Sequence, residues 1–304
     1  MRSIHVIRGL AVLICALVMA GCDRPREDED LSPRYVSGTN RDVQEMVLAV
    51  HPLHNPQKLH EVFSPLIEYL NRKVPGVRFF LEASRDYASF DSKLYSGQFQ
   101  FALPNPYQTI TALKHGYHVF AKMGEDQDFR GIFIVRKDSG IKGVTDLVGK
   151  KVAYPAPTAL AACIMPQYFL HAHGIDVTHD IDNRYVGSQE SSIMNVYLGN
   201  VAAGATWPPP WRAFVKEHPD MAAELEVIWE TEPLVNNSFM VRDDVAPEVV
   251  REVRDALLEL PSHAEGRAIL ASMETCCIDA AEDATYQPVI DFVRKFSRSV
   301  RPLE

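Results

Sequence analysis

Residues Met46–Leu70 read MVLAV HPLHN PQKLHEVFSPLIEYL, and this stretch decides the fold class. Its first five residues, Met46–Val50, form a continuous apolar run, which is typical of a buried parallel strand. A short polar loop, His51–Asn55, follows. Apolar residues then recur at helical spacing: Leu59, Val62, Phe63, Leu66 and Leu70. A strand, a loop and an amphipathic helix in this order predict an α/β fold in which helices cover a sheet.

The same alternation continues along the chain in two series. Further strands are expected at Val77–Leu81, Phe99–Leu103, Tyr117–Ala121, Gly131–Val135, Lys151–Tyr154, Asn183–Val186, Ala203–Thr206, Leu225–Trp229 and Phe239–Val241. Helices are expected at Tyr87–Leu94, after Pro106, at Thr158–His173 and Ser191–Leu198, from Pro247, and around Tyr286–Phe296. Two series of this kind predict two α/β lobes with a ligand cleft between them.

Polar stretches place the expected boundaries of the lobes. Gly124–Arg130 and Thr231–Asn237 are the predicted crossings, which together would form a hinge. Residues 43–126 plus 236–304 then make the first lobe and residues 127–235 the second.

Composition excludes several classes of protein. The chain has 304 residues, of which 46% are hydrophobic and 23% charged, which is ordinary globular composition and excludes disorder or a fibrous repeat. The formal net charge is −9 and no dense Lys/Arg run occurs, so no nucleic-acid partner is expected. Five cysteines without a CxxC pair exclude a disulfide scaffold and a zinc knuckle.

The N-terminus has the features of an export signal. Arg2 and Arg8 precede an apolar run of 11 residues, Leu10–Ala20, which is too short for the roughly 20 residues of a membrane-spanning helix. Residues 18–22 (VMAGC) resemble a bacterial lipobox, which implies cleavage after residue 21 and a lipid anchor on Cys22. The alternative is an ordinary signal peptide cut nearby, with Cys22 a plain thiol. Asp23 fits retention at the periplasmic face of the inner membrane, and residues 22–42 are polar enough for a flexible tether.

Five segments, in chain order, carry a family resemblance: Ser64–Leu70, Arg85–Tyr87, Leu103–Tyr107, Gly149–Pro155 and Val186–Glu190. With these segments the sequence resembles the phosphate/phosphite/phosphonate (PhnD-like) group of solute-binding proteins of ABC transporters. The resemblance implies a type II periplasmic binding protein: two lobes, each a mixed sheet flanked by helices, that close by a hinge motion. It also implies a small anionic or zwitterionic ligand, such as an oxyanion or a phosphonate-like compound, an ABC permease as membrane partner, and no cofactor.

Three departures from the family pattern leave the identity of the ligand open. The turn Pro155–Ala159 has one hydroxyl where the family has several, Gln189 replaces the usual histidine, and Ala202 stands in place of an acid.

The loops that follow parallel strands meet at one edge of a sheet, where helix N-termini offer free N–H groups to an anion. The expected ligand-binding residues are His54, Tyr87, Asn105, Tyr107, Tyr154, Thr158, Ala159, Ser188, Gln189 and Trp207. Thr158 and Ser188 have an alternative role as helix N-caps, and Tyr107 as a buried aromatic. The aromatic residues near these loops favour a ligand with a small organic part.

Rival chemistries have little support in the residues. The histidine pairs lack cysteine or carboxylate neighbours at metal-ligand spacing, so no metal is expected. No GxSxG, HExxH, GxGxxG or P-loop motif occurs, so no catalytic residue is assigned and the protein is not expected to be an enzyme. The vicinal pair Cys276-Cys277 is consistent with a redox or thiophilic site or with a structural role. A periplasmic sensing subunit of a histidine-kinase system, with the same closure, is the alternative to transport.

Overall fold

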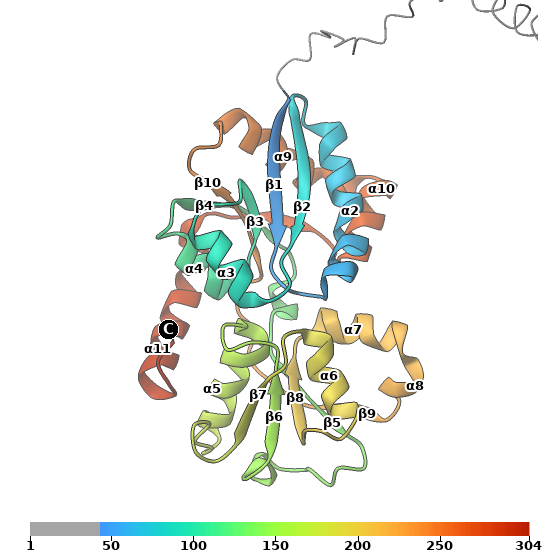
Figure 1. The fold of residues 1–304 in the computed structure, drawn as a ribbon, viewed down its shortest axis with the longest axis vertical. Helices are drawn as coiled ribbons and strands as arrows, with labels where there is room; N and C mark the ends of the chain where they lie inside the picture. The colour runs from blue at the N-terminus through green and yellow to red at the C-terminus, as the bar shows by residue number, and fades with distance from the viewer. Residues whose placement is uncertain (1–42, 304) are drawn as a thin grey trace, which may run out of the picture. The chain divides into compact units, whose positions relative to one another are not determined.

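The computed structural model describes residues 43–303, and their strands form two separate sheets (Figure 1). The predicted leader 1–21, the tether 22–42 and Cys22 lie outside the described residues. No helix among the described residues is long and apolar enough to cross a membrane.

The first sheet has six strands in the spatial order β11 (Ile278–Ala280), β4 (Tyr117–Met123), β10 (Ser238–Arg242), β3 (Phe101–Leu103), β1 (Gln44–Val50) and β2 (Val77–Ala83). Strand β1 lies parallel to β2 and β3, and β10 is antiparallel to β3 and β4. The helices of this lobe are α2 (Pro56–Lys73), α3 (Tyr87–Tyr95), α4 (Pro106–Ala112), α9 (Pro247–Glu259), α10 (Ala264–Ser272) and α11 (Gln287–Ser299). Helix α2 buries the predicted apolar stripe, including Leu59, Phe63 and Leu66, against the sheet.

The second sheet has five strands in the order β7 (Asp182–Tyr185), β6 (Lys151–Tyr154), β8 (Ala203–Thr206), β5 (Ile132–Arg136) and β9 (Leu225–Glu230). Its helices are α5 (Met165–Ala172), α6 (Gln189–Tyr197), α7 (Pro208–Glu217) and α8 (Pro219–Ala222), and a π-helical turn at Leu160–Ile164 leads directly into α5. Both lobes are therefore mixed sheets flanked by helices.

Two segments of chain join the lobes. The chain leaves the first sheet after β4 and returns to it before β10, so the crossings are residues 124–131 and 231–237. The two crossings are hydrogen-bonded to each other: the Thr231 N–H donates to Gly131 O at 2.8 Å, and the Leu234 N–H donates to Phe129 O at 2.9 Å. This paired ribbon is the structural basis of a hinge. The residue limits of the two lobes stay a prediction.

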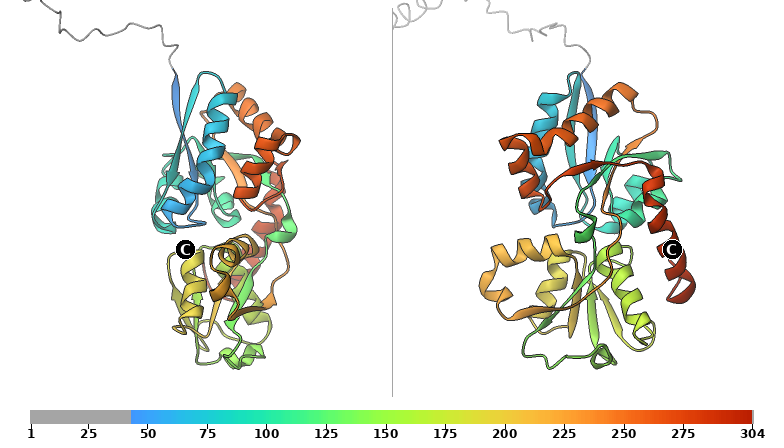
Figure 2. Two further views of the ribbon diagram at one scale, coloured as in Figure 1. Left: turned by 90° about the vertical axis from the view of Figure 1, so that its right-hand side faces the viewer. Right: turned by 180° about the vertical axis from the view of Figure 1, so that it is seen from behind.

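The C-terminal helix forms an additional link between the lobes. Helix α11 runs from the first lobe along the second, beside α5 (Figures 1 and 2). The ring of Phe292 meets that of Tyr168 with centroids 5.3 Å apart. Beyond the helix, the Arg301 guanidinium donates to Gln167 Oε1 at 2.8 Å and to Pro157 O at 3.1 Å.

Candidate functional site

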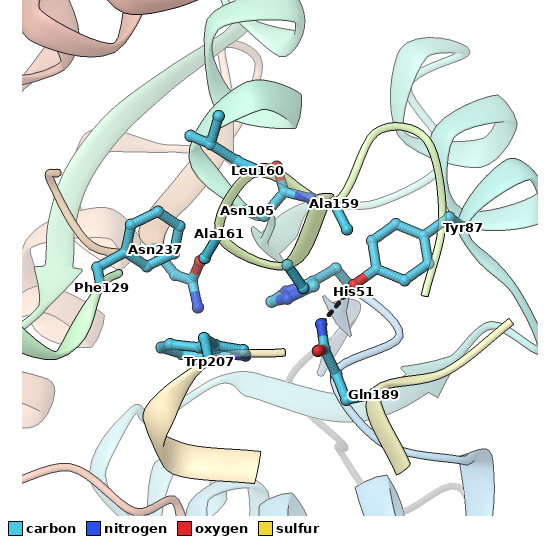
Figure 3. A pocket seen from close by; sticks show the side chains of 11 residues that line it. His51, Tyr87, Asn105, Phe129, Ala159, Leu160, Ala161, Gln189, Trp207 and Asn237 are labelled. Carbon is cyan, nitrogen blue, oxygen red and sulfur yellow. Dashed lines mark hydrogen bonds between the residues drawn. The ribbon is translucent and has the colours of Figure 1, made fainter. Parts of the chain in front are cut away.

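A small cavity lies between the lobes at the carboxyl ends of the parallel strands (Figure 3). The first lobe contributes His51, Tyr87 and Asn105, the first crossing contributes Phe129, and the second crossing contributes Asn237. The second lobe contributes Ala159, Leu160, Ala161, Ala162, Gln189 and Trp207. The space open to the centre of a water-sized molecule is about 10 Å³, close to what one water needs. The lobes are therefore closed against each other at this point, and the hinge must open to admit a ligand larger than a water.

His51, directly after β1, contributes a hydrogen-bond acceptor to the cavity. Its Nδ1 lies 3.0 Å from Leu103 O, and because a carbonyl can only accept, Nδ1 carries the proton. Burial lowers the pKa of His51 to about 4, so the ring is neutral at physiological pH. Nε2 of a neutral ring protonated at Nδ1 has a free lone pair. That atom is suited to accept a hydrogen bond from a protonated oxygen of a ligand.

The lowered pKa of His51 predicts a loss of stability in acid. An unfolded histidine titrates near 6.5, whereas the native one titrates near 4, so between these values the unfolded chain binds more protons. Unfolding should therefore become easier as the pH falls from 6.5 toward 4, with a share from His51 on the order of 3 kcal/mol.

Comparison of the wild type with a His51→Asn variant by urea denaturation across this range isolates that share. The Asn Nδ2 can keep the bond to Leu103 O without titrating. The variant's free energy of unfolding should fall less steeply than that of the wild type as the pH is lowered. If the two proteins lose stability in parallel, the lowered pKa of His51 is wrong. His54, whose pKa burial also lowers to about 4, is present in both proteins and cancels.

Tyr87, Gln189 and Thr206 form a chain of hydrogen bonds across the cleft. The Thr206 hydroxyl donates to Gln189 Oε1 at 2.8 Å, and Gln189 Nε2 donates to the Tyr87 hydroxyl at 3.3 Å (Figure 3). Because the Tyr87 oxygen accepts in this chain, its own hydrogen can point to a ligand. Burial raises the pKa of Tyr87 above its usual value, which keeps that hydrogen in place.

Asn237 brings a buried amide with unmet hydrogen-bonding capacity to the other end of the cavity. The residue is fully buried, and its Oδ1 has no hydrogen-bond partner within the described residues. Its Nδ2 reaches only the Met123 sulfur, at 3.8 Å, which is a weak acceptor. At this end Asn237 lies beside Phe129 and Trp207 (Figure 3). The centroids of those two rings are 5.5 Å apart. Buried amides are normally satisfied, so this one is suited to a ligand.

The π-helical turn supplies backbone donors. Its N-cap, Ala159, makes no side-chain cap, and the first N–H groups of a helix have no acceptor within that helix. Residues 160–162, which carry these groups, line the cavity. The turn continues into α5, so the positive end of the combined helix dipole faces the cavity. No Lys, Arg, Asp or Glu is among the described residues that line it, so only these backbone groups and neutral side chains are available to meet the charge of a ligand.

Five predicted site residues line this cavity: Tyr87, Asn105, Ala159, Gln189 and Trp207. Asn105 also has a structural role, because its Oδ1 caps α4 while its Nδ2 donates to Thr158 O at 3.2 Å across the cleft.

The other five predicted residues lie elsewhere: Tyr107, Tyr154, Thr158, Ser188 and His54. Tyr154 is buried in the core of the second lobe, and Ser188 caps α6 by accepting from the Ser191 N–H. Thr158 lies outside the helix it was expected to cap and lines a neighbouring groove with Asp91. Tyr107 is buried in the first turn of α4, and His54 is half-buried near Lys58. A ligand-binding role for these residues stays a prediction.

The sequence reasoning missed His51, Phe129, Asn237 and residues 160–162 as lining residues. His51 lies in a predicted cleft loop, but its spacing to His54 suggests a metal ligand rather than a ligand-binding residue. Phe129 and Asn237 lie within the predicted crossings. A hinge segment passes behind the cleft, so its inward side chains could have been proposed from that position alone.

Two mixed α/β lobes, a paired hinge and a polar cavity between them define the class of type II periplasmic binding proteins. The crystal structure of a binding protein of an ABC phosphonate transporter from Pseudomonas aeruginosa matches this fold with a TM-score of 0.77 and 17% identity, covering 85% of this chain and 88% of that one. PhnD1 from Prochlorococcus marinus MIT 9301, crystallised with methylphosphonate, matches with a TM-score of 0.75 and 19% identity, covering 84% of this chain and 99% of that one. The predicted fold class is confirmed.

The family model described as "ABC transporter, phosphonate, periplasmic substrate-binding protein" matches residues 48–286, and the chain belongs to this family. The predicted recognition is thus confirmed, and the family is one of binding proteins rather than enzymes. A curated relative, the probable ABC transporter phosphite-binding protein PhnD1 of Prochlorococcus marinus MIT 9301, is 24% identical over 193 residues. That match spans 59% of this chain and 65% of the relative.

Proposed function

We propose that the protein is the solute-binding component of an ABC transporter, which closes its lobes on a small phosphonate-like oxyanion and presents it to a membrane permease. Family membership supports the class, and one observation supports the ligand: the cavity combines backbone N–H donors of the second lobe with the buried, partnerless amide of Asn237 from the hinge. Contacts from both lobes are what a ligand needs to shift the population toward the closed form.

The polar groups of the cavity favour an anion that keeps one proton. The π-helical turn, the Tyr87 hydroxyl and Asn237 Nδ2 are donors, while His51 Nε2 and Asn237 Oδ1 are acceptors. A fully deprotonated anion would leave both acceptors unpaired, and unpaired buried groups cost free energy. The rings of Phe129 and Trp207 can pack against the hydrogen or methyl group on the phosphorus of the ligand. No carboxylate is among the described lining residues to pair with an amine, so phosphite and methylphosphonate fit better than an aminoalkyl phosphonate.

A ligand panel tests this proposal. Phosphite and methylphosphonate should raise the melting temperature of the mature protein, because a ligand that binds only the folded form stabilises it. Sulfate, which keeps no proton at neutral pH, should have no effect at the same concentration. Calorimetric titration of the positive compounds then gives affinities. If sulfate stabilises the protein as well as phosphite does, the acceptor argument is wrong, and if no compound does, the ligand class is wrong.

The proposed location is the periplasmic face of the inner membrane, with a lipid on Cys22. The lipobox-like residues 18–22 support this, and metabolic labelling with a radioactive fatty acid that is lost in a Cys22→Ala variant tests it.

A further inference from the structure

Cys276 and Cys277 lie in the first lobe, between α10 and β11, away from the cavity. Both are free cysteines, and their sulfur atoms lie 2.8 Å apart. Cys276 is exposed and Cys277 half-buried, whereas the remaining described cysteine, Cys163, is buried. The two thiols are therefore adjacent, facing each other and accessible to a reagent from solution.

The backbone of this pair holds the start of the first crossing. The Cys276 N–H donates to Glu125 Oε2 at 3.0 Å, and the Gly124 N–H donates to Cys277 O at 3.0 Å. Packing here is tight, because a β-carbon at Gly124 would collide with the sulfur of Cys277. Glu125 has a left-handed backbone, with φ 59°, which a non-glycine residue adopts only when its surroundings hold it. The cysteine pair is part of those surroundings.

Glu274, two residues before Cys276, connects the same segment to the second lobe. The Arg212 guanidinium, on α7, donates to Glu274 O at 3.1 Å, and Lys216 Nζ lies 2.5 Å from Glu274 Oε1. Glu274 also has a left-handed backbone, with φ 56°. Residues 274–277 thus contact the hinge at one end and the second lobe at the other, so a change in their backbone acts on both.

We propose that Cys276 and Cys277 form a redox site that controls the hinge. The reaction is thiol–disulfide exchange with oxidised glutathione or the disulfide of an oxidoreductase. One Sγ–Sγ bond forms between the two cysteines, their two hydrogens and two electrons pass to the oxidant, and its disulfide is released as two thiols. The product is a small ring that contains the peptide bond between the two residues.

Ring closure changes the positions of the groups that hold the hinge. The Cys276 N–H and the Cys277 carbonyl are attached to the two α-carbons of the ring, so ring closure should shift both groups away from their present bonds to Glu125 and Gly124. Oxidation should therefore loosen residues 124–131 and weaken the closed arrangement of the lobes. A coupling of this kind changes the equilibrium constant for local opening of these residues by roughly five-fold or more.

Mass spectrometry and hydrogen exchange test the proposal without any ligand, so failure of the proposed function would leave the result interpretable. Trypsin releases both cysteines in one peptide, residues 268–294. After incubation of the mature protein with oxidised glutathione and alkylation, this peptide should be two hydrogens lighter than the reduced, unalkylated form. Amide exchange in residues 124–131 should be roughly five-fold faster than in the reduced protein, and reduction should reverse both changes.

The matched controls are Cys277→Ser, which cannot form the ring, and Cys163→Ser, which keeps it. Oxidant should leave hinge exchange unchanged in the first and accelerate it in the second. Three results would overturn the proposal: no intramolecular disulfide in residues 268–294, cross-linking of two chains through Cys276 in its place, or a disulfide that leaves exchange in residues 124–131 unaltered.

Discussion

Replacement of Asn237 by aspartate should weaken the binding of phosphite or methylphosphonate by about 100-fold, because like charges brought together in a buried site cost several kcal/mol. The two side chains have the same shape, so the change adds one negative charge where Asn237 is fully buried beside the cavity. Calorimetric titration with methylphosphonate at neutral pH, where much of the ligand still carries its last proton, measures the loss of affinity.

An Asn237→Leu variant separates charge from hydrogen bonding. It removes the amide without adding charge and should lose only about tenfold in affinity, the value of one or two hydrogen bonds. Both variants should remain folded, which thermal unfolding without ligand checks. If the aspartate variant binds as tightly as the wild type, Asn237 does not contact the anion. Tighter binding would likewise contradict a contact between the ligand's negative charge and Asn237.

Replacement of Gly131 by alanine should lower the free energy of unfolding by about 1 to 3 kcal/mol. A β-carbon at Gly131 would lie 2.5 Å from Ala161 O and 2.7 Å from Pro166 Cγ, so the π-helical turn must move to admit it. The same turn presents the backbone donors to the cavity, so affinity for the ligand should fall as well. Urea denaturation measures the first effect and titration with phosphite the second.

Gly143, in the second lobe, offers a matched control. A β-carbon there would have its nearest neighbouring atom 3.8 Å away, and the φ of −118° suits any residue. Gly143→Ala should therefore leave ligand affinity unchanged and stabilise the fold by about 0.4 to 1 kcal/mol, through a less flexible unfolded chain. Equal stability of the Gly131 and Gly143 variants would show that the contact at Gly131 is loose.

The sequence was sufficient to predict the fold class because each lobe is built from segments with clear periodicity. The apolar run at Met46–Val50 and the stripe of α2 carry their structure in their own residues. Strand β11 and helices α7, α8 and α10 were not predicted. Strand β11 has only three residues, and α7 begins with three consecutive prolines, a composition more typical of a loop than of a helix.

The cavity was less predictable than the fold. Cleft loops can be identified because they follow parallel strands, and this brought Tyr87, Asn105 and Gln189 to the site. Which face of a loop points inward depends on tertiary packing, so Ser188 is a candidate for ligand binding from sequence although its hydroxyl caps α6. The unmet amide of Asn237 has no sequence signal, because partners and burial exist only in the folded chain.

The C-terminal segment holds the two lobes together on one side of the cleft. Beside α11, the hydrogen bonds from Arg301 to Gln167 and Pro157 join the C-terminal segment to the second lobe. On the side of α2 and α7 (Figure 1), the lobes meet through exposed polar contacts, Lys58 with Glu217 and Asn55 with Glu190. Such contacts contribute little free energy in water. The lobes should therefore separate most easily on the side of α2 and α7, and we expect solute to enter and leave there.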